Sequence, residues 1–79
     1  MEVIIYSKDN CSKCSKAKKK LNKFNPKIII LNKDINRDEF FKKFPKSKSL
    51  PQIIINNNHI GGYEDLEKWL AFNIPDENF

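Results

Sequence analysis

Several residue types are scarce in this sequence. The 79 residues include two cysteines, two glycines, one tryptophan and one histidine. Two cysteines are too few for the dense disulfide framework of a small secreted domain, which excludes that class of protein. A chain of this length has room for one hydrophobic core, so we expect a single domain over residues 1–79.

Long apolar stretches are also absent. The longest uninterrupted apolar run, from Ile28 to Leu31, has four residues, whereas a membrane-spanning helix needs about 20. The N-terminal residues lack the basic region, apolar segment and cleavage site of a secretory signal. We therefore expect a soluble, cytoplasmic protein with no membrane partner, whose cysteines face a reducing environment.

Negative charge is in the minority, with ten Asp and Glu against fifteen Lys and Arg and a formal net charge of +5. Fourteen of the fifteen cations are lysines, a bias that an AT-rich coding sequence would also produce. The charge favours acidic partners in general. The lysine-rich segment 13–23 has no exposed aromatic residues between its lysines, so nucleic-acid binding is a remote alternative and we expect no nucleic-acid partner.

Hydrophobic periodicity predicts alternating strands and helices. The expected strands are residues 2–7, 27–33, 51–55 and 59–60, with a turn at 56–58. The expected helices run from residue 11 to the Asn25-Pro26 pair, from Asn36 to Pro45, and over 63–74. The residues expected to face the core are Cys14, Ala17, Leu21 and Phe24, then Phe40, Phe41 and Phe44, then Leu66, Trp69 and Leu70. The order β-α-β-α-β-β-α predicts an α/β fold with a parallel pair of strands, a right-handed crossover, an antiparallel hairpin and a frayed tail at 75–79.

The segment Cys11-Ser12-Lys13-Cys14 is the strongest chemical signal. Two thiols three positions apart on a helical turn can form a disulfide with little backbone movement. Cys11 would begin the first helix, where unpaired N–H groups and the helix dipole favour a thiolate, and Lys8 and Lys13 would add positive charge. Cys14 lies one turn inside, on the apolar face. We therefore expect Cys11 to be the nucleophile and Cys14 the resolving thiol.

Two other interpretations of the cysteine pair are open at this stage. A C-x-x-C pair is half of a zinc site, but a structural zinc ion takes four ligands and only His59 can be added to the two thiols. The cysteines could also be merely structural, although core thiols seldom lie at the exposed start of a helix. We expect no bound metal.

Two later segments agree with a redox function. Ser49-Leu50-Pro51-Gln52 has a proline at the start of a strand, where a cis peptide would bring the Leu50 backbone towards Cys11 and an ordinary trans proline is the alternative. Gly61-Gly62-Tyr63-Glu64-Asp65 opens the last helix, where free N–H groups can hold a carboxylate and Asp65 can meet an ammonium. The segment would then seat the α-amino-acid end of a ligand. The alternative is a glycine turn followed by acidic residues that favour the helix dipole.

Taken together, these motifs resemble the small dithiol glutaredoxins, which belong to the thioredoxin-like superfamily. The similar stretches are Tyr6 to Cys14, Ser49 to Ile53 and His59 to Leu66, in the family's order and spacing. The resemblance covers nearly the whole chain. It implies a thioredoxin-like (glutaredoxin) fold, with a four-stranded mixed sheet flanked by helices. It also implies a glutathione-dependent thiol–disulfide oxidoreductase that reduces protein disulfides and glutathione mixed disulfides through Cys11 and Cys14.

The resemblance further implies a groove for glutathione, which would be the reductant. Two cations match the positions that engage its glycine carboxylate. A segment with a cis proline matches the part that pairs with its cysteinyl main chain, and the start of the last helix matches the part that holds its γ-glutamyl end. These residues are, in order, Lys8 and Arg37; Leu50 and Pro51; and Gly62, Tyr63, Glu64 and Asp65, with Lys13 as an additional cation near the anionic tripeptide.

The sequence departs from the family's usual Cys-Pro-Tyr-Cys, because Ser12 replaces the proline and Lys13 replaces the tyrosine. This removes a rigid residue and an aromatic wall from the groove. Ser12 is similar to the serine of glutaredoxins that bridge an iron–sulfur cluster with glutathione, so a cluster carrier is one alternative function. A redoxin reduced by thioredoxin reductase is another. We expect a monomer that acts on disulfide-containing proteins; ribonucleotide reductase is one client of the family, and nothing in this sequence selects it.

Overall fold

The computed structural model of the chain describes residues 1–47 and 49–73. Its elements are β1 (Val3–Ser7), α1 (Ser12–Leu21), the 3-10 turn η1 (Asn22–Phe24), β2 (Lys27–Ile30), α2 (Arg37–Lys43), β3 (Gln52–Ile55), β4 (Asn58–Gly61) and α3 (Tyr63–Asn73). This is the β-α-β-α-β-β-α order that the sequence predicts. The expected frayed tail at 75–79 lies outside the described residues.

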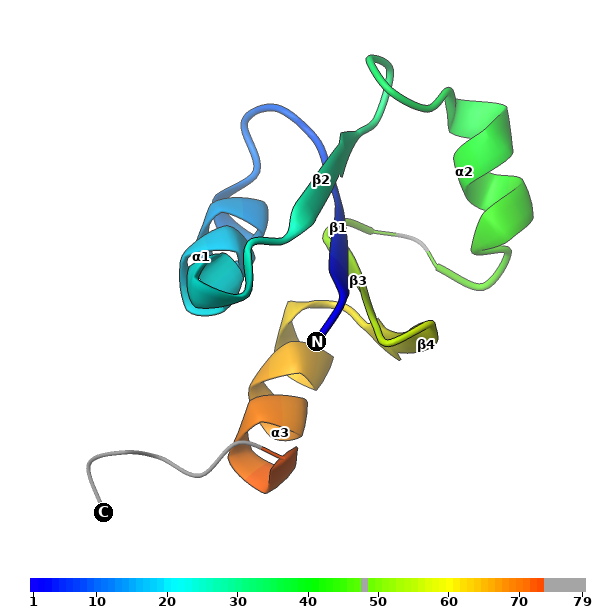
Figure 1. Cartoon of the computed structure of the whole chain (residues 1–79). Helices are drawn as coiled ribbons and strands as arrows, with labels where there is room; N and C mark the ends of the chain where they lie inside the picture. Colours follow the sequence, from blue (N-terminus) through cyan, green and yellow to red (C-terminus); the bar gives the residue numbers. More distant parts are fainter. Residues whose placement is uncertain (48, 74–79) are drawn as a thin grey trace.

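The four strands form one mixed sheet in the order β2-β1-β3-β4 (Figure 1). β1 runs parallel to β2, with Ile5 opposite Ile28, and antiparallel to β3, with Ile5 opposite Ile53. β3 and β4 form a hairpin, and its turn residues Asn56 and Asn57 both have positive φ angles, which asparagine tolerates better than most residues. The expected parallel pair and antiparallel hairpin are therefore confirmed.

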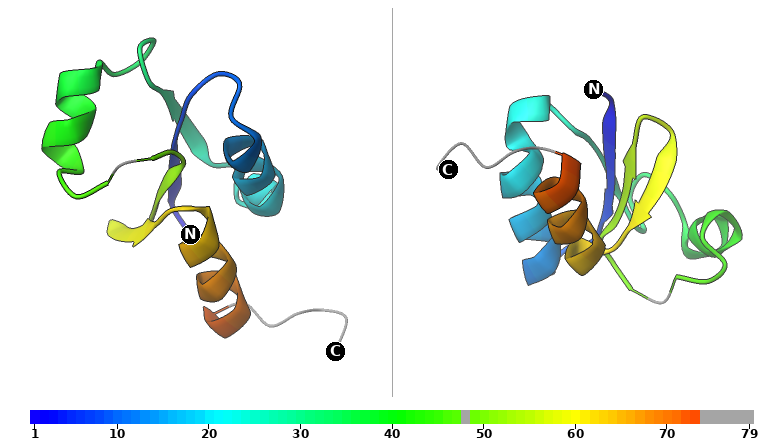
Figure 2. Two further views of the ribbon diagram at one scale, coloured as in Figure 1. Left: turned by 180° about the vertical axis from the view of Figure 1, so that it is seen from behind. Right: turned by 90° about the horizontal axis from the view of Figure 1, so that it is seen from below.

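Helices cover both faces of the sheet. Seen from below, α1 and α3 lie side by side on one face, and α2 lies alone on the other (Figure 2, right). Alternate residues of the inner strands β1 and β3 therefore point into two separate cores. Core A, on the side of α1 and α3, consists of Val3, Ile5, Ala17, Leu21, Ile53, Ile55 and Leu66, and core B, on the side of α2, consists of Tyr6, Phe40 and Phe44.

Asparagines mark the helix boundaries. The side chain of Asn36 accepts a hydrogen bond from the N–H of Glu39 at 2.8 Å, so α2 begins with a side-chain cap at the residue where the sequence predicts that the helix starts. At the end of the first helical segment, α1 changes into η1, and Asn25 then adopts a left-handed conformation with φ of 54°. Pro26 follows and prevents the helix from continuing.

The expectation for Phe41 is wrong. Phe40 and Phe44 are buried in core B, but Phe41 is 38% exposed. α2 has only seven residues, so one narrow face meets the sheet, and positions four apart share that face while the next position along points away from it. The Phe41 ring instead packs against the edge of Phe40, with 5.3 Å between the ring centroids.

The second strand is shorter than predicted. β2 ends at Ile30 rather than at residue 33, because the chain turns there: the N–H groups of Lys33 and Asp34 donate to the Ile30 carbonyl oxygen at 3.1 and 2.8 Å, and the Asp34 carboxylate accepts a hydrogen bond from the N–H of Ile30 at 2.9 Å. Asn32 has a positive φ of 70° inside the resulting turn. A single bridge between Leu31 and Ile35 closes this turn, which leads into α2.

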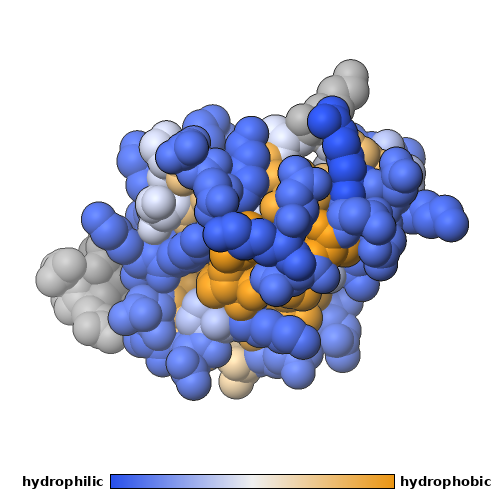
Figure 3. All heavy atoms as spheres, turned by 90° about the horizontal axis from the view of Figure 1, so that it is seen from above, coloured by the Kyte–Doolittle hydropathy of each residue, from blue (hydrophilic) through white to orange (hydrophobic). Residues whose placement is uncertain are grey.

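Part of the apolar packing reaches the surface. Several residues packed against core B are only partly buried, and Figure 3 shows apolar surface framed by hydrophilic side chains on the face seen from above. None of the helices in the described part of the chain combines the length and the apolar composition that crossing a bilayer requires.

Candidate active site

The first cysteine of the pair begins α1. Cys11 is the N-cap residue, with an extended backbone, and its Sγ accepts a hydrogen bond from the N–H of Cys14 at 3.2 Å. Asn10, just before it, has a positive φ of 56°, which helps to turn the chain from the end of β1 into the helix. The helix therefore directs a backbone donor at the sulfur for which the sequence predicts the nucleophilic role.

The two sulfur atoms are joined in a disulfide, and the Cα atoms of Cys11 and Cys14 are 5.2 Å apart. Cys14 is 1% exposed within α1, whereas Cys11 is partly exposed at the N-terminal end of the helix. A reductant that arrives from solvent therefore reaches Cys11 first. This asymmetry agrees with one accessible and one shielded thiol.

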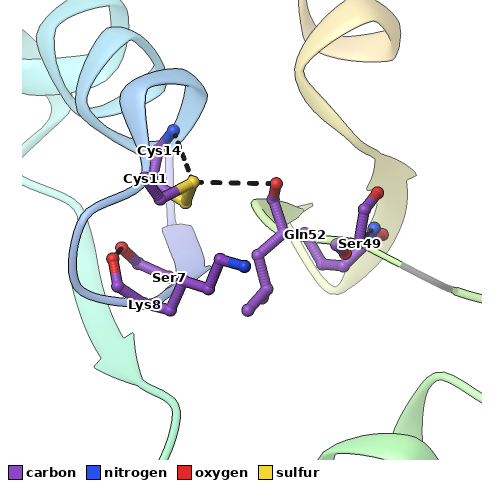
Figure 4. Close-up of a disulfide and its surroundings, with 7 residues drawn as sticks. Ser7, Lys8, Cys11, Cys14, Ser49 and Gln52 are labelled. Carbon is purple, nitrogen blue, oxygen red and sulfur yellow. Dashed lines mark hydrogen bonds between the residues drawn. A yellow bond between two sulfur atoms is a disulfide. The ribbon is translucent and has the colours of Figure 1, made fainter.

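The loop between β1 and α1 adds a cation beside Cys11. Lys8 is exposed, and its side chain extends towards the segment that leads into β3 (Figure 4). The acidic residue of the same loop, Asp9, forms an ion pair with Lys33 at 3.4 Å. A shallow depression beside the cysteine is lined by Lys8, Asp9, Asn10, Cys11, Ser12, Ser15 and Lys18.

A second segment approaches the disulfide from β3. The peptide bond between Leu50 and Pro51 is cis, as the resemblance implies, and Pro51 is buried. The Leu50 carbonyl oxygen lies 3.8 Å from Sγ of Cys11 (Figure 4). With the disulfide closed this sulfur carries no proton, so the approach is a contact rather than a hydrogen bond. The Leu50 backbone therefore lies next to Cys11, as the sequence predicts.

Gln52 is a residue that the sequence pattern did not single out. It is 5% exposed, and both the nitrogen and the oxygen of its side-chain amide have hydrogen-bonding partners. Nε2 donates to the Ser49 carbonyl oxygen at 2.9 Å, and Oε1 lies 2.7 Å from Nε2 of His59. The His59 ring also packs against Phe44, with 4.7 Å between centroids. The sequence does contain a signal for this role, since Gln52 is a polar residue in a strand that otherwise reads Ile-Ile-Ile. A buried amide needs hydrogen-bonding partners, so such a position indicates a polar interaction inside the fold.

Lys13, between the two cysteines, forms an ion pair with Glu64 at the start of α3. Both side chains are largely exposed. The hydrogen bond to Glu64 and its negative charge raise the pKa of Lys13 above its ordinary value of 10.5. The hydrogen bond from Lys13 likewise lowers the pKa of Glu64 below its ordinary value of 4.5. The two residues that the sequence assigned to a ligand therefore bind each other across α1 and α3.

The start of α3 adjoins the cis-proline segment. A side chain at Gly62 would meet the carbonyl oxygen of Pro51 at 3.6 Å. The Gly62 N–H donates to the Asp65 carboxylate at 3.0 Å, so this acidic residue caps its own helix. Tyr63 is partly buried and packs against core A. The four residues from Gly62 to Asp65 therefore lie together, with part of the acidic charge already engaged within the chain.

Arg37 is the expected ligand that is least connected to this group. It begins α2, and its guanidinium lies over the Phe41 ring of the same helix, 5.7 Å from the centroid. No hydrogen bond or ion pair among residues 1–47 and 49–73 links it to the other expected glutathione ligands.

The side chains that could bind zinc already bind other groups. Cys11 and Cys14 are bonded to each other, and His59, the one further ligand that it could use, bonds to Gln52. In the part of the chain that the structure describes, no three His, Cys, Asp or Glu side chains gather around a possible metal position. Two paired sulfur atoms, one of them accessible, can instead undergo thiol–disulfide exchange.

Comparison with known proteins gives a consistent result. The family model described as Glutaredoxin matches residues 3–60. Glutaredoxin 1 of Rickettsia prowazekii (strain Madrid E) is 38% identical over 68 residues, which cover 81% of this chain and 72% of the relative. The crystal structure of glutaredoxin 1 from Francisella tularensis, complexed with cacodylate, has a TM-score of 0.75 at 25% identity and covers 89% of this chain and 92% of that one. A buckwheat glutaredoxin–glutathione complex shares the fold, with a TM-score of 0.74, 22% identity and coverage of 87% and 67%.

Proposed function

We propose, from the premise that this chain belongs to the glutaredoxin family and is a thiol–disulfide oxidoreductase, that glutathione is its reductant and that Cys11 carries the exchange. The observation that carries the proposal is the contrast between the two sulfur atoms. Cys11 is accessible at the start of α1 beside the Leu50 main chain, and Cys14 is buried one turn inside. Nucleophilic attack needs the first environment and resolution needs only proximity.

On a glutathione mixed disulfide, the Cys11 thiolate attacks the glutathione sulfur. A disulfide forms between Cys11 and glutathione, and the substrate leaves as a thiolate that takes a proton from water. A second glutathione thiolate then attacks the bound glutathione sulfur, which releases oxidised glutathione and restores the Cys11 thiolate. The N–H of Cys14 and the helix N-terminus stabilise the negative charge on Sγ before and after the cycle.

On a protein disulfide, Cys14 completes the reaction. Cys11 attacks one client sulfur and forms a mixed disulfide with the client, whose other sulfur leaves as a thiolate. The Cys14 thiolate then attacks Cys11, which releases the reduced client and forms the Cys11–Cys14 disulfide that this structure contains. Two glutathione molecules reduce that disulfide and become oxidised glutathione, so electrons balance over the cycle.

In the proposed groove, an extended glutathione lies along the Leu50 main chain, and each of its two ends meets groups of complementary charge. Lys8 and Arg37 bind the glycine carboxylate, and the start of α3 binds the γ-glutamyl end. Two observations support this arrangement: the Leu50 carbonyl lies next to Cys11, and Gly62 lies next to Pro51. The fold shared with the buckwheat glutaredoxin–glutathione complex is compatible with it.

A coupled assay with NADPH separates the two electron donors. We expect turnover of a glutathione mixed disulfide with glutathione and glutathione reductase, and little with thioredoxin reductase alone. The reverse result would favour the redoxin reduced by thioredoxin reductase.

The proposed groove is tested by reversing the charge of Arg37, the expected ligand that no hydrogen bond or ion pair in the described part of the chain links to the others. Arg37→Glu should raise the KM for a glutathione mixed disulfide roughly tenfold, because a partly exposed pair of charges is worth on the order of 1–2 kcal/mol when attraction becomes repulsion. Lys42→Glu makes the same charge change on the same helix and is the matched control. High salt should weaken the wild-type interaction in part. Equal KM values for wild type and both variants would remove Arg37 from the site.

A further inference from the structure

The segment that faces Cys11 is held by a buried amide from the strand that follows it. Gln52 lies three residues after Ser49, and its Nε2 donates to the Ser49 carbonyl oxygen at 2.9 Å. This bond closes a short ring around Leu50 and Pro51. Because Gln52 is 5% exposed, solvent does not readily replace the bond.

The hydrogen-bonding capacities of the partners determine how the amide is oriented. The Ser49 carbonyl can only accept, so the NH₂ group of Gln52 must face it, and Oε1 must face His59. Nε2 of His59 must therefore carry a proton. The imidazole satisfies this in its protonated form and in the neutral Nε2–H tautomer.

The histidine is itself fixed by its surroundings. Its ring packs against Phe44 at the end of α2, with 4.7 Å between centroids, and its backbone belongs to β4, opposite Ile54 of β3. One side-chain relay therefore runs from β4 through Gln52 to the Ser49 carbonyl. The next residue along the chain is Leu50, whose carbonyl oxygen lies 3.8 Å from Sγ of Cys11.

We infer that Gln52 and His59 are positioning residues for thiol–disulfide exchange, which hold the Leu50 main chain at the distance where it pairs with a peptide-like thiol joined to Cys11. The inference rests on the proposed function, since it takes glutathione mixed disulfides as substrates. It assigns the relay to recognition of the substrate main chain and not to the chemistry of the sulfur. Substrates whose thiol carries no peptide bond gain nothing from it.

The test compares two mixed disulfides of 2-mercaptoethanol, which has no peptide main chain: one with glutathione and one with cysteamine, which has no peptide main chain either. Gln52→Met keeps the length of the side chain and removes both hydrogen bonds. His59→Phe keeps the packing against Phe44 and removes the donor. We expect each variant to raise the KM for the glutathione disulfide about three- to tenfold, the usual effect of losing a hydrogen bond. The rate with the cysteamine disulfide should stay within about twofold of wild type.

Two further variants make the result specific. Ser49→Ala keeps the carbonyl that Gln52 uses and should behave as wild type. His59→Gln returns an N–H donor to the place of Nε2 and should restore most of the lost affinity. If Gln52→Met fails to fold, His59→Phe still gives the test, because His59 is an exposed residue.

The outcomes distinguish the inference from the function on which it rests. If the wild type does not turn over the glutathione disulfide, the proposed function fails. If it does, and the variants slow both disulfides equally or neither, the relay has at most a structural role and the inference is overturned. A selective rise in KM for glutathione, reversed in His59→Gln, supports it.

Discussion

At the scale of single residues, the environments of the two sulfur atoms differ more than their three-position spacing suggests. Cys11 receives a backbone hydrogen bond and contacts the Leu50 carbonyl, while Cys14 is enclosed by core packing.

Cys11→Ser should abolish all exchange because it removes the accessible nucleophile. Cys14→Ser should keep activity on glutathionylated substrates and lose it on protein disulfides, because only the second reaction needs the resolving thiol. Steady-state assays with both substrates check this, and equal losses in the two variants would contradict the roles.

The Lys13–Glu64 pair predicts a pH-dependent contribution to stability. Glu64 has a lowered pKa, so its contribution is fully present above pH 4.5 and is lost as the pH falls through the folded-state pKa. Lys13 has a raised pKa, so its contribution is fully present below pH 10.5 and is lost as the pH rises through the folded-state pKa. Lys13→Met should therefore lower Tm slightly near neutral pH, and the difference from wild type should shrink at both extremes.

Thermal unfolding over that pH range measures the effect of the pair. Lys16→Met is the matched control, since it removes an exposed lysine of the same helix for which no ion pair is found in the described part of the chain. A Tm difference that stays constant with pH would show that Lys13 acts through packing or helix propensity instead of its charge.

At the scale of elements, α2 is attached to the sheet by two aromatic residues. Phe40 and Phe44 fill core B against Tyr6, whose ring centroid lies 4.9 Å from that of Phe44. Phe40→Ala should lower the free energy of unfolding by about 3–5 kcal/mol, because it leaves a cavity in the core. Phe41→Ala, next to it on the exposed side, should cost less than about 1 kcal/mol. Urea unfolding of both variants checks the contrast, and similar losses would mean that Phe41 contributes to core B after all.

The junction between β4 and α3 depends on one of its two glycines. Gly61 has a φ of 122°, and a Cβ there would collide with the Asp65 carboxylate, whereas a Cβ at Gly62 meets only ordinary contacts. Gly61→Ala should therefore cost roughly 1–3 kcal/mol of stability. Gly62→Ala should cost less. Chemical unfolding of the two variants provides the measurement, and the opposite ranking would refute this account of the junction.

At the scale of the whole molecule, features that depend on local pattern could be predicted and features that depend on distant neighbours could not. The element order and the position of Cys11 follow from hydrophobic periodicity and helix-start signals, which are local. The early end of β2 depends on Asp34 folding back on Ile30. The Gln52–His59 bond depends on the register of β3 with β4, and the Lys13–Glu64 pair depends on how α1 packs beside α3. No periodicity in the sequence reports these juxtapositions.

The place of β1 in the sheet also bears on how the chain is made. β1 precedes the other three strands of its sheet in the chain and is an inner strand, with Ile4 opposite Lys27 on one side and Val3 opposite Ile55 on the other. Its second partner, β3, begins at Gln52, 45 residues after β1 ends at Ser7. During translation the isoleucines of β1 therefore have no complete sheet to join, and closing such a long loop is slow. Folding of the complete sheet is thus expected to wait until β3 has left the ribosomal tunnel.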